Sequence, residues 1–316
     1  MIVVGGEALV DLVPDPSTRR GELGPLLPRL GGGPYNTAVA LGRLGAPVAF
    51  LSRVSRDAFG DALVERLVGA GVDIRFVQRG PEPTTLAVVT LAADGSARYT
   101  FHVAGTADRL VADPGALPDE LTTLSVGTLG MVLEPGASVY EAMLRRESER
   151  GRLVVVDPNV RTGLIEDADA YRARFRSWLS HITVLKASVE DACWLAELPA
   201  ESPIEQVEAV VREWLDAGVS AVVLTRGGDG LSSFTASGDK IEVPAVRATV
   251  ADTIGAGDTV HAALLAWLSQ HGVESAGQVR KLEAKDWSEA LGFAARAAAI
   301  TVSRVGAEPP FAAELA

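Results

Sequence analysis

The stretch GGGPYNTAVALGRLGAPVAFLSRV, residues 31–54, contains the pattern that decides the fold. It opens with three glycines and continues into an amphipathic segment, residues 36–45, that is typical of a helix. The apolar run VAFLSRV, residues 48–54, follows at once and is typical of a strand that is buried on both faces. A helix that leads through a short turn into such a strand is the repeating unit of a parallel sheet covered by helices.

The same alternation runs along most of the chain. Apolar segments that predict further strands lie at residues 2–10, 121–130, 152–159, 183–188 and 221–228. Amphipathic segments that predict helices lie at residues 57–71, 139–151, 170–182 and 204–218. The sequence therefore predicts an α/β fold, in which a doubly wound, mostly parallel sheet carries helices on both faces. We expect one domain that spans residues 1–316.

Two segments interrupt this alternation with hairpin patterns. The segment at residues 84–103 holds two β-like runs around Asp94-Gly95, and a second hairpin pattern occupies residues 230–245. A hairpin does not fit between crossover helices, so we expect residues 84–103 to project as a small β lid, together with about 12–30. A plain solvent-facing hairpin, or a contact in a homodimer through the lid, is the alternative.

Composition and charge exclude several classes of protein. The chain has 316 residues, 47% of them hydrophobic, and its net charge of −12 disfavours binding to nucleic acid and to anionic membranes. The lone cysteine, Cys193, rules out an intrachain disulfide and a cysteine-based zinc cluster. The first fifteen residues lack the basic segment of a signal peptide, and no charge-free stretch has transmembrane length. We therefore expect a cytoplasmic protein.

Polar residues follow the predicted strands at the edge where a parallel sheet binds its ligands. Carboxylates, amides, glycines and other polar residues come after four of these strands, and this suggests a polar ligand. They are Glu7, Asp11, Asp157, Asn159, Arg161, Ser188, Glu190, Asp191, Arg226, Gly227, Gly228, Asp229 and Gly230.

Two glycine-rich motifs leave alternatives open when each is taken alone. In GGGPYN, residues 31–36, Asn36 is either a helix cap or an amide that both donates to and accepts from a hydroxyl-rich ligand. The motif TRGGDG, residues 225–230, resembles a phosphate loop only loosely, and an ordinary turn is the simpler interpretation. It matches neither the Walker A motif nor the dinucleotide-binding fingerprint.

The motif DTIGAGD, residues 252–258, is more specific. Glycines at a helix start can expose consecutive backbone N–H groups, and the helix dipole adds positive potential there. Such a site suits a phosphoryl group in transfer. Asp258, in the first turn, could accept the proton of an attacking hydroxyl, or could only complement the dipole while Val260, Leu264 and Trp267 fill the core.

Together these segments resemble the PfkB, or ribokinase-like, family of sugar kinases. Residues 31–61 look like the first family signature and residues 252–268 look like the second. The order of the acidic first loop, the glycine motif, the lid hairpin, the DPNVR segment at 157–161 and the GAGD turn also agrees, so the resemblance covers essentially the whole chain. The segments GEALVDLVP, GGGPYN and DPNVR are most similar to those of fructokinases.

The resemblance implies a ribokinase-like fold and transfer of the γ-phosphoryl group of ATP to a sugar hydroxyl, with fructose as the expected sugar. It makes Asp258 the general base, and the backbone amides of Gly255, Ala256 and Gly257 the anion hole. Residues that would bind the sugar are Asp11, Gly32, Gly33, Asn36, Arg98, Asn159 and Arg161.

The resemblance also places the nucleotide and its cations. Ser188, Thr225, Gly228 and Gly230 would lie on the nucleotide side. Asp191 would organise Mg²⁺, and Asp252 would lie near a monovalent cation such as K⁺. Here the chain departs from the family, which commonly has Asn-x-x-Glu where this sequence has Ser188 and Asp191. A shorter carboxylate could still act on Mg²⁺ through water.

Several other substrates stay open at this stage. Ribose, 2-keto-3-deoxygluconate, a sugar phosphate or a nucleoside are alternatives to fructose, and Tyr35 is the obvious aromatic platform for a nucleoside. A sugar phosphate would need a basic cluster for its phosphate, which we cannot place. A ligand-sensing protein of the same fold without catalysis is the alternative from another class, and the altered Ser-x-x-Asp element is what favours it.

Overall fold

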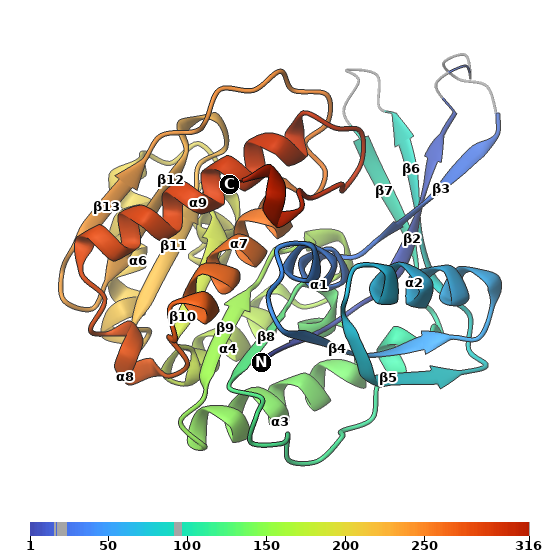
Figure 1. The fold of residues 1–316 in the computed structure, drawn as a ribbon, viewed down its shortest axis with the longest axis horizontal. Coiled ribbons are helices and arrows are strands. Elements are labelled where there is room, and N and C mark those ends of the chain that lie inside the picture. Colours follow the sequence, from blue (N-terminus) through green and yellow to red (C-terminus); the bar gives the residue numbers. More distant parts are fainter. Residues whose placement is uncertain (16, 18–23, 92–96, 316) are drawn as a thin grey trace.

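The computed structural model describes residues 1–15, 17, 24–91 and 97–315. Within these residues nine strands form one large sheet in the order β13-β12-β11-β10-β9-β8-β1-β4-β5 (Figure 1). The strands from β5 to β11 are parallel to their neighbours, and only β12 and β13 are antiparallel. Their bounds are β1 Ile2–Gly5, β4 Val48–Ser55, β5 Asp73–Gly80, β8 Thr123–Gly127, β9 Leu153–Asp157, β10 Val184–Ser188, β11 Ala221–Thr225, β12 Leu231–Thr235 and β13 Lys240–Val243.

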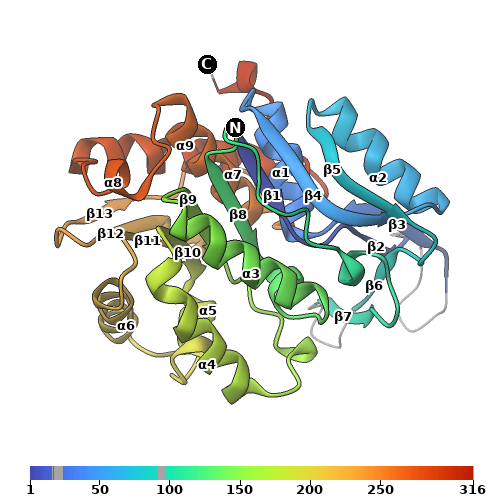
Figure 2. The same cartoon turned by 90° about the horizontal axis from the view of Figure 1, so that it is seen from below.

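Helices cover both faces of this sheet (Figure 2). One face carries α1 Gly33–Arg43, α2 Ala58–Gly69, α7 Ala256–Gln270, α8 Ala276–Val279 and α9 Ala284–Val302. The other face carries α3 Gly136–Glu149, α4 Ala168–Trp178, α5 Val189–Leu195 and α6 Ile204–Asp216. The predicted doubly wound, mostly parallel sheet is therefore confirmed.

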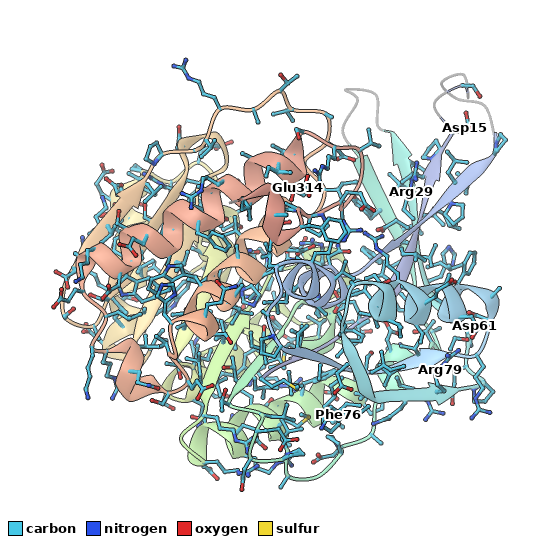
Figure 3. All side chains as sticks on the ribbon, viewed as in Figure 1. Asp15, Arg29, Asp61, Phe76, Arg79 and Glu314 are labelled. Carbon is cyan, nitrogen blue, oxygen red and sulfur yellow. The ribbon has the colours of Figure 1, made fainter. Side chains whose placement is uncertain are left out.

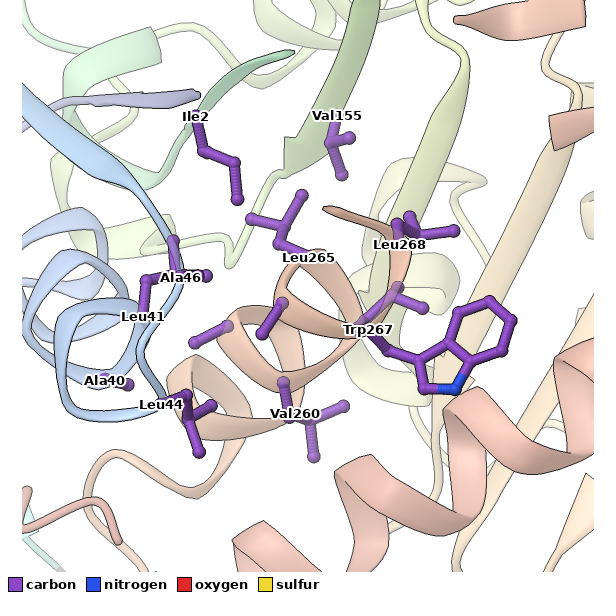
Figure 4. Packing of buried hydrophobic residues seen from close by; sticks show 14 of the residues in the cluster. Ile2, Ala40, Leu41, Leu44, Ala46, Val155, Val260, Leu265, Trp267 and Leu268 are labelled. Atoms are coloured by element: carbon purple, nitrogen blue, oxygen red, sulfur yellow. The ribbon is translucent and has the colours of Figure 1, made fainter. Parts of the chain in front are cut away.

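The central strands are apolar throughout because each one feeds two cores. In β1, Ile2 and Val4 belong to the core beneath α7, whereas Val3 belongs to the core beneath α3. Figure 4 shows Ile2 and Val155 pointing toward Leu265 of α7. Alternate side chains of a strand point to opposite faces, so a strand buried on both faces has no polar face to show in its sequence.

A second, smaller sheet lies beside the large one, toward its β4–β5 end (Figure 1). Its order is β3-β2-β6-β7, with β2 Leu9–Pro14, β3 Leu26–Gly31, β6 Thr85–Leu91 and β7 Ala97–His102. The predicted small β element is thus confirmed, although it begins at Leu9. The expected Asp94-Gly95 turn and most of the loop between β2 and β3 lie outside the described residues.

Other features of the framework agree with the sequence. Residues 230–245 form the predicted second hairpin as β12 and β13, and Cys193 is buried.

An ion pair of 2.6 Å between Arg79 and Asp61 joins β5 to α2 at the surface (Figure 3). In the part of the chain that the structure describes, no helix is long and apolar enough to cross a membrane.

Two glycines of α2 provide a test of how tightly the helix packs on the sheet. A Cβ atom at Gly60 would lie 2.0 Å from the Ser55 carbonyl oxygen, whereas one at Gly69 would meet no atom within 4 Å. Gly60→Ala should therefore cost about 1–3 kcal/mol of unfolding free energy through overpacking. Gly69→Ala, the matched control, should be neutral or stabilise by up to about 1 kcal/mol. Urea unfolding of both variants would check this, and equal midpoints would contradict it.

Candidate active site

A cavity of about 460 Å³ lies between the carboxyl edge of the large sheet and the second sheet. Nine of the residues predicted from the sequence line it: Asp11, Gly32, Gly33, Asn36, Asn159, Arg161, Gly255, Gly257 and Asp258. Ala256 is the first residue of α7, between two of these lining residues. Residues far apart in the sequence thus meet in one hollow, which is large enough for a small polar ligand.

Asp258 is the third residue of α7 and is held by Asn36. The Asn36 Nδ2 atom donates to Asp258 Oδ2 at 2.9 Å, across a separation of 222 residues in the chain. The interpretation of Asn36 as a helix cap is wrong, because α1 begins at Gly33 and its cap position is Gly32. Burial raises the pKa of Asp258 to about 6, while the Asn36 hydrogen bond opposes that rise. The carboxyl group is therefore a base matched to near-neutral pH.

The turn before α7 exposes backbone N–H groups to the same cavity. Gly255 has a φ of 76°, and a Cβ there would lie 2.7 Å from that of Ala307, so the turn requires glycine. The amide of Ala256 donates to the Thr253 carbonyl at 3.3 Å. The amides of Gly255, Gly257 and Asp258 find no acceptor among the described residues. Three free donors at a helix N-terminus are an arrangement that favours binding of an anion.

Gly33 brings the backbone close to the polar side chains above it. A Cβ at this position would lie 2.7 Å from Thr128 Oγ1, 3.2 Å from Asn159 Nδ2 and 3.5 Å from Asp258 Oδ1. Thr128 and Asn159 both have positive φ angles, of 52° and 39°. Such backbone strain in non-glycine residues concentrates at functional sites. The hydroxyl, the amide and the carboxyl group therefore converge on one point above Gly33.

Glu7 is a residue of the site that the sequence analysis did not assign. Its Oε1 atom accepts from the Gly33 amide and its Oε2 atom from the Gly130 amide, both at 3.1 Å. The side chain is 3% exposed, and burial raises its pKa to about 8. In the sequence Glu7 is one of several polar residues that follow predicted strands, and its spacing carries no further signal.

Two further lining residues, Asp11 and Arg161, carry opposite charges. Burial raises the pKa of Asp11 to about 6, and Arg161 opposes this rise. Arg161 donates to the side-chain oxygen of Asn159 at 2.8 Å. Lining residues that the sequence analysis did not assign to a ligand are Glu7, Leu9, Tyr99, Phe101, Thr128, Leu129, Thr253 and Ile254.

The aromatic residues of the site differ from the expectation. Tyr35 is fully buried and its hydroxyl donates to the Leu63 carbonyl at 3.1 Å, so it cannot be a platform for a base. Tyr99 and Phe101 of β7 line the cavity instead, and their rings stack with centroids 6.0 Å apart. Arg98 lies on the same strand, opposite Thr90, and its side chain lies outside the described residues.

Three of the four predicted nucleotide-side residues lie at the end of β11 and in the turn after it, outside the cavity lining. Thr225 ends β11, and Gly228 lies in the turn Gly227–Asp229 with no atom within 4 Å of the place of a Cβ. Gly230 has a φ of 95°, and a Cβ there would lie 2.2 Å from the Val243 carbonyl oxygen. Gly228 thus leaves open space for a ligand, whereas Gly230 is required by the turn that precedes β12.

Ser188 and Asp191 form a capping box at the start of α5. The Oδ2 atom of Asp191 accepts from the amide and the hydroxyl of Ser188, at 3.0 and 2.8 Å, and Oδ1 accepts from the Val160 amide at 2.7 Å. Both oxygens are occupied within the protein, so Asp191 fixes the loop that carries Asn159 and Arg161.

Asp252 closes the turn before α7 from its other side. Its Oδ1 atom accepts from the Ile254 amide at 3.0 Å and its Oδ2 atom from the Gly306 amide at 2.9 Å. Among the described residues, no three His, Cys, Asp or Glu side chains gather in an arrangement that could hold a metal ion. A divalent ion in this site would therefore depend on phosphate oxygens and water, as Mg²⁺ commonly does.

Comparison with known proteins identifies relatives over the full length. The model of the pfkB family carbohydrate kinases matches residues 1–313. A fructokinase from Rhizobium leguminosarum bv. trifolii is 38% identical over 285 residues, which are 90% of this chain and 84% of that protein.

Solved structures show the same fold. The fructokinase of Xylella fastidiosa with bound ATP superposes with a TM-score of 0.87 at 28% identity, covering 99% of this chain and 96% of the other. A fructokinase double mutant from Vibrio cholerae, bound to fructose, ADP and a potassium ion, gives a TM-score of 0.82 at 25% identity, covering 97% and 93%.

The buried Glu7 should make the stability of the protein depend on pH. Its pKa is about 8 in the folded protein and 4.5 for the free group, so between these values a rise in pH favours the unfolded chain, which releases the proton more readily. As the pH rises through this range, the unfolding free energy of the wild type should therefore fall relative to that of Glu7→Gln, by up to about 1.4 kcal/mol per pH unit. Urea unfolding from about pH 5 to about pH 8 measures this difference. Parallel stability curves for the two proteins would contradict it.

Proposed function

Because the chain belongs to the PfkB family of carbohydrate kinases, we propose that it transfers the γ-phosphoryl group of ATP to a hydroxyl of fructose. The observation that carries this proposal is the meeting of Asp258 with the free amides of Gly255 and Gly257 in one cavity. A base and an anion site side by side are the two parts that phosphoryl transfer to an alcohol requires. The identity of fructose is supported by the fructokinases among the relatives.

The geometry suggests how the reaction proceeds. A sugar hydroxyl above Gly33 would donate its proton to Asp258 while its oxygen attacks the γ-phosphorus, and the bond to the β-phosphate oxygen breaks as ADP leaves. The free amides and the positive end of the α7 dipole stabilise the charge on the phosphoryl oxygens. Asn36 keeps Asp258 pointed at the hydroxyl. Thr128, Asn159 and Asp11 supply further partners for the sugar hydroxyls.

The cations of the reaction belong to the proposal as well. Mg²⁺ would travel with ATP and neutralise its phosphates, held by phosphate oxygens and water. Asp191 would serve this site through water or through the loop that it fixes, because its oxygens already accept three hydrogen bonds. A monovalent cation would lie near Asp252, and the use of such a cation is supported by the potassium ion bound to the Vibrio cholerae fructokinase. Thr225 and Gly228 would face the nucleotide.

The second sheet would act as the lid of this site. Tyr99 and Phe101 line the cavity from β7, and Asp11 lines it from β2. A lid that closes on the sugar excludes water, and water is the competing acceptor of the phosphoryl group. The apolar rings of β7 suit that purpose better than polar side chains would.

A substrate panel tests the proposed reaction. ADP release from Mg-ATP should be stimulated by fructose, and more strongly than by ribose, 2-keto-3-deoxygluconate, fructose 6-phosphate or adenosine. The comparison uses kcat/KM for each acceptor, because this ratio measures discrimination between substrates. Preference for another acceptor would reject fructose. Fructose binding by calorimetry without stimulated ADP release would favour the sensing protein.

Removal of the base tests the role of Asp258. Asp258→Asn keeps the size of the side chain but cannot accept the proton, so kcat should fall by about 10²- to 10⁴-fold. The Kd for ATP and the unfolding midpoint should stay close to those of the wild type. Asp119→Asn is the matched control, because its side chain is 99% exposed. The residue also lies before the amino end of β8, whereas the cavity lies at the carboxyl edge of the sheet. A near-normal kcat in Asp258→Asn would show that another group takes the proton.

A further inference from the structure

A buried lysine lies directly beneath the candidate anion site. Lys186 is on β10, and its Nζ atom is 2.7 Å from Asp157 Oδ2 at the end of β9. The two side chains are 4% and 9% exposed. A Cβ at Gly257 would lie 3.2 Å from Lys186 Nζ, so the ammonium group is packed against the backbone that faces the cavity.

The position of this ion pair is unfavourable for stability alone. A cation at a helix N-terminus faces the positive end of the dipole, and burying two charges costs free energy that apolar side chains of similar volume would avoid. The pair is also incompletely satisfied. Asp157 Oδ1 is buried without a hydrogen-bond partner, and the ammonium makes one hydrogen bond to the described residues although it has three donors. These costs indicate a role in the chemistry of the site.

The charged and titratable groups around Asp258 come from several elements. Asn36 of α1 donates to it, Lys186 of β10 and Arg161 after β9 attract its negative charge, and Asp157 of β9 and Asp11 of β2 oppose it. His261, one turn along α7, is buried and its pKa is lowered to about 3 by burial and by Lys186, so it stays neutral. The charge of Asp258 is thus set mainly by burial, with Lys186 and Asp157 acting in opposite directions.

The Lys186 ammonium keeps its own charge in this environment. Burial alone would lower its pKa, but the attraction and hydrogen bond of Asp157, together with the negative charges of Asp191 and Asp258, outweigh burial and raise the pKa above the ordinary value. Asp157 is therefore the hydrogen-bonded member of three carboxylates that together maintain the positive charge beneath α7.

We propose that Lys186 is a positioning residue for phosphoryl transfer: tethered by Asp157, it keeps Asp258 ionised and adds positive charge beneath the amides of α7. The catalytic part of this inference rests on the function proposed above. The effect on the ionisation of Asp258 does not, because it belongs to the ligand-free protein. Lys186 acts through Asp258 and through the field at the helix start, and touches neither substrate.

The two members of the pair give opposite predictions for the pKa of Asp258. Asp157→Asn removes a repelling negative charge, so the pKa of Asp258 should fall. Adding Lys186→Met to that variant removes the attracting charge without leaving a buried carboxylate unpaired, so the pKa should rise relative to Asp157→Asn by about 1 unit. Asp157→Asn/Lys186→Arg keeps the positive charge and should stay close to the single variant.

The measurement is a pH titration of the Asp258 carboxyl carbon by NMR in protein labelled with ¹³C-aspartate. The Asp258 signal is assigned by its loss in Asp258→Asn. Lys240→Met is the matched control, because Lys240 of β13 pairs with Glu208 of α6 and Glu242 of β13, none of which lines the cavity. It should leave the titration unchanged. For variants that retain activity, the acid limb of the pH profile of kcat/KM should move in the same direction as the Asp258 pKa, because this ratio reports the free enzyme.

The outcomes separate this inference from the proposed function. A lower Asp258 pKa in Asp157→Asn than in the wild type, and a higher one in Asp157→Asn/Lys186→Met than in Asp157→Asn, support the inference whether or not the protein phosphorylates fructose. An identical Asp258 titration in Asp157→Asn and Asp157→Asn/Lys186→Met would overturn it and leave the ion pair a structural contact. If the double variant does not fold, the test rests on Asp157→Asn alone. An Asp258 pKa in Asp157→Asn that equals or exceeds that of the wild type would also overturn the inference. Absence of sugar-stimulated ADP release in the wild type would reject only the function.

Discussion

The hydrogen bond from Asn36 to Asp258 is the constraint on which the rest of the site depends. It joins the first turns of α1 and α7, two helices that begin at the same edge of the sheet and pack against one another on one face. Because both helix starts are fixed together, the glycine backbone of one and the free amides of the other face the same cavity. A small change in the angle between α1 and α7 would separate the Asp258 carboxyl group from the glycine backbone of α1.

The close approach of these two helix starts requires glycine at particular positions. Gly33 lies where a side chain would collide with Thr128 and crowd Asp258, and Gly255 lies where one would collide with Ala307. At both positions a methyl group would occupy the space needed by a ligand or by the neighbouring segment. The glycines of the two motifs thus have different purposes: Gly33 opens the floor of the cavity, and Gly255 shapes the turn that exposes the amides.

The sequence predicted the sheet well because its signal is local. A strand buried between two helical layers is apolar at every position, as in Val154, Val155 and Val156, and no distant partner is needed to recognise it. The glycine motifs were also local, and the structure brings most of their residues to one cavity. Their chemical roles remain predictions.

The residues that the sequence analysis missed are defined by contacts between distant segments. Glu7 matters because the amides of Gly33 and Gly130 reach its two oxygens, and Thr128 because of its strained backbone beside Gly33. Asp191 is expected from the family resemblance to organise Mg²⁺, and the structure adds that it accepts from Val160 and forms a capping box. The packing of one loop on another leaves no periodicity in either segment, so only the folded structure could reveal these roles.

A net charge of −12 poses a physical problem for a protein that binds a nucleotide. The described structure answers it locally rather than with a basic surface. Free backbone amides at the start of α7 supply fixed partial charges, and Lys186 places a full charge beneath them, where solvent screens it little. This arrangement requires a buried ion pair between Lys186 and Asp157, which costs free energy of desolvation. In addition, the two charges of that pair act on the ionisation of the Asp258 carboxyl group. In the proposed mechanism, anion binding and the strength of the base are therefore coupled through the same few atoms, so a change in one would change the other.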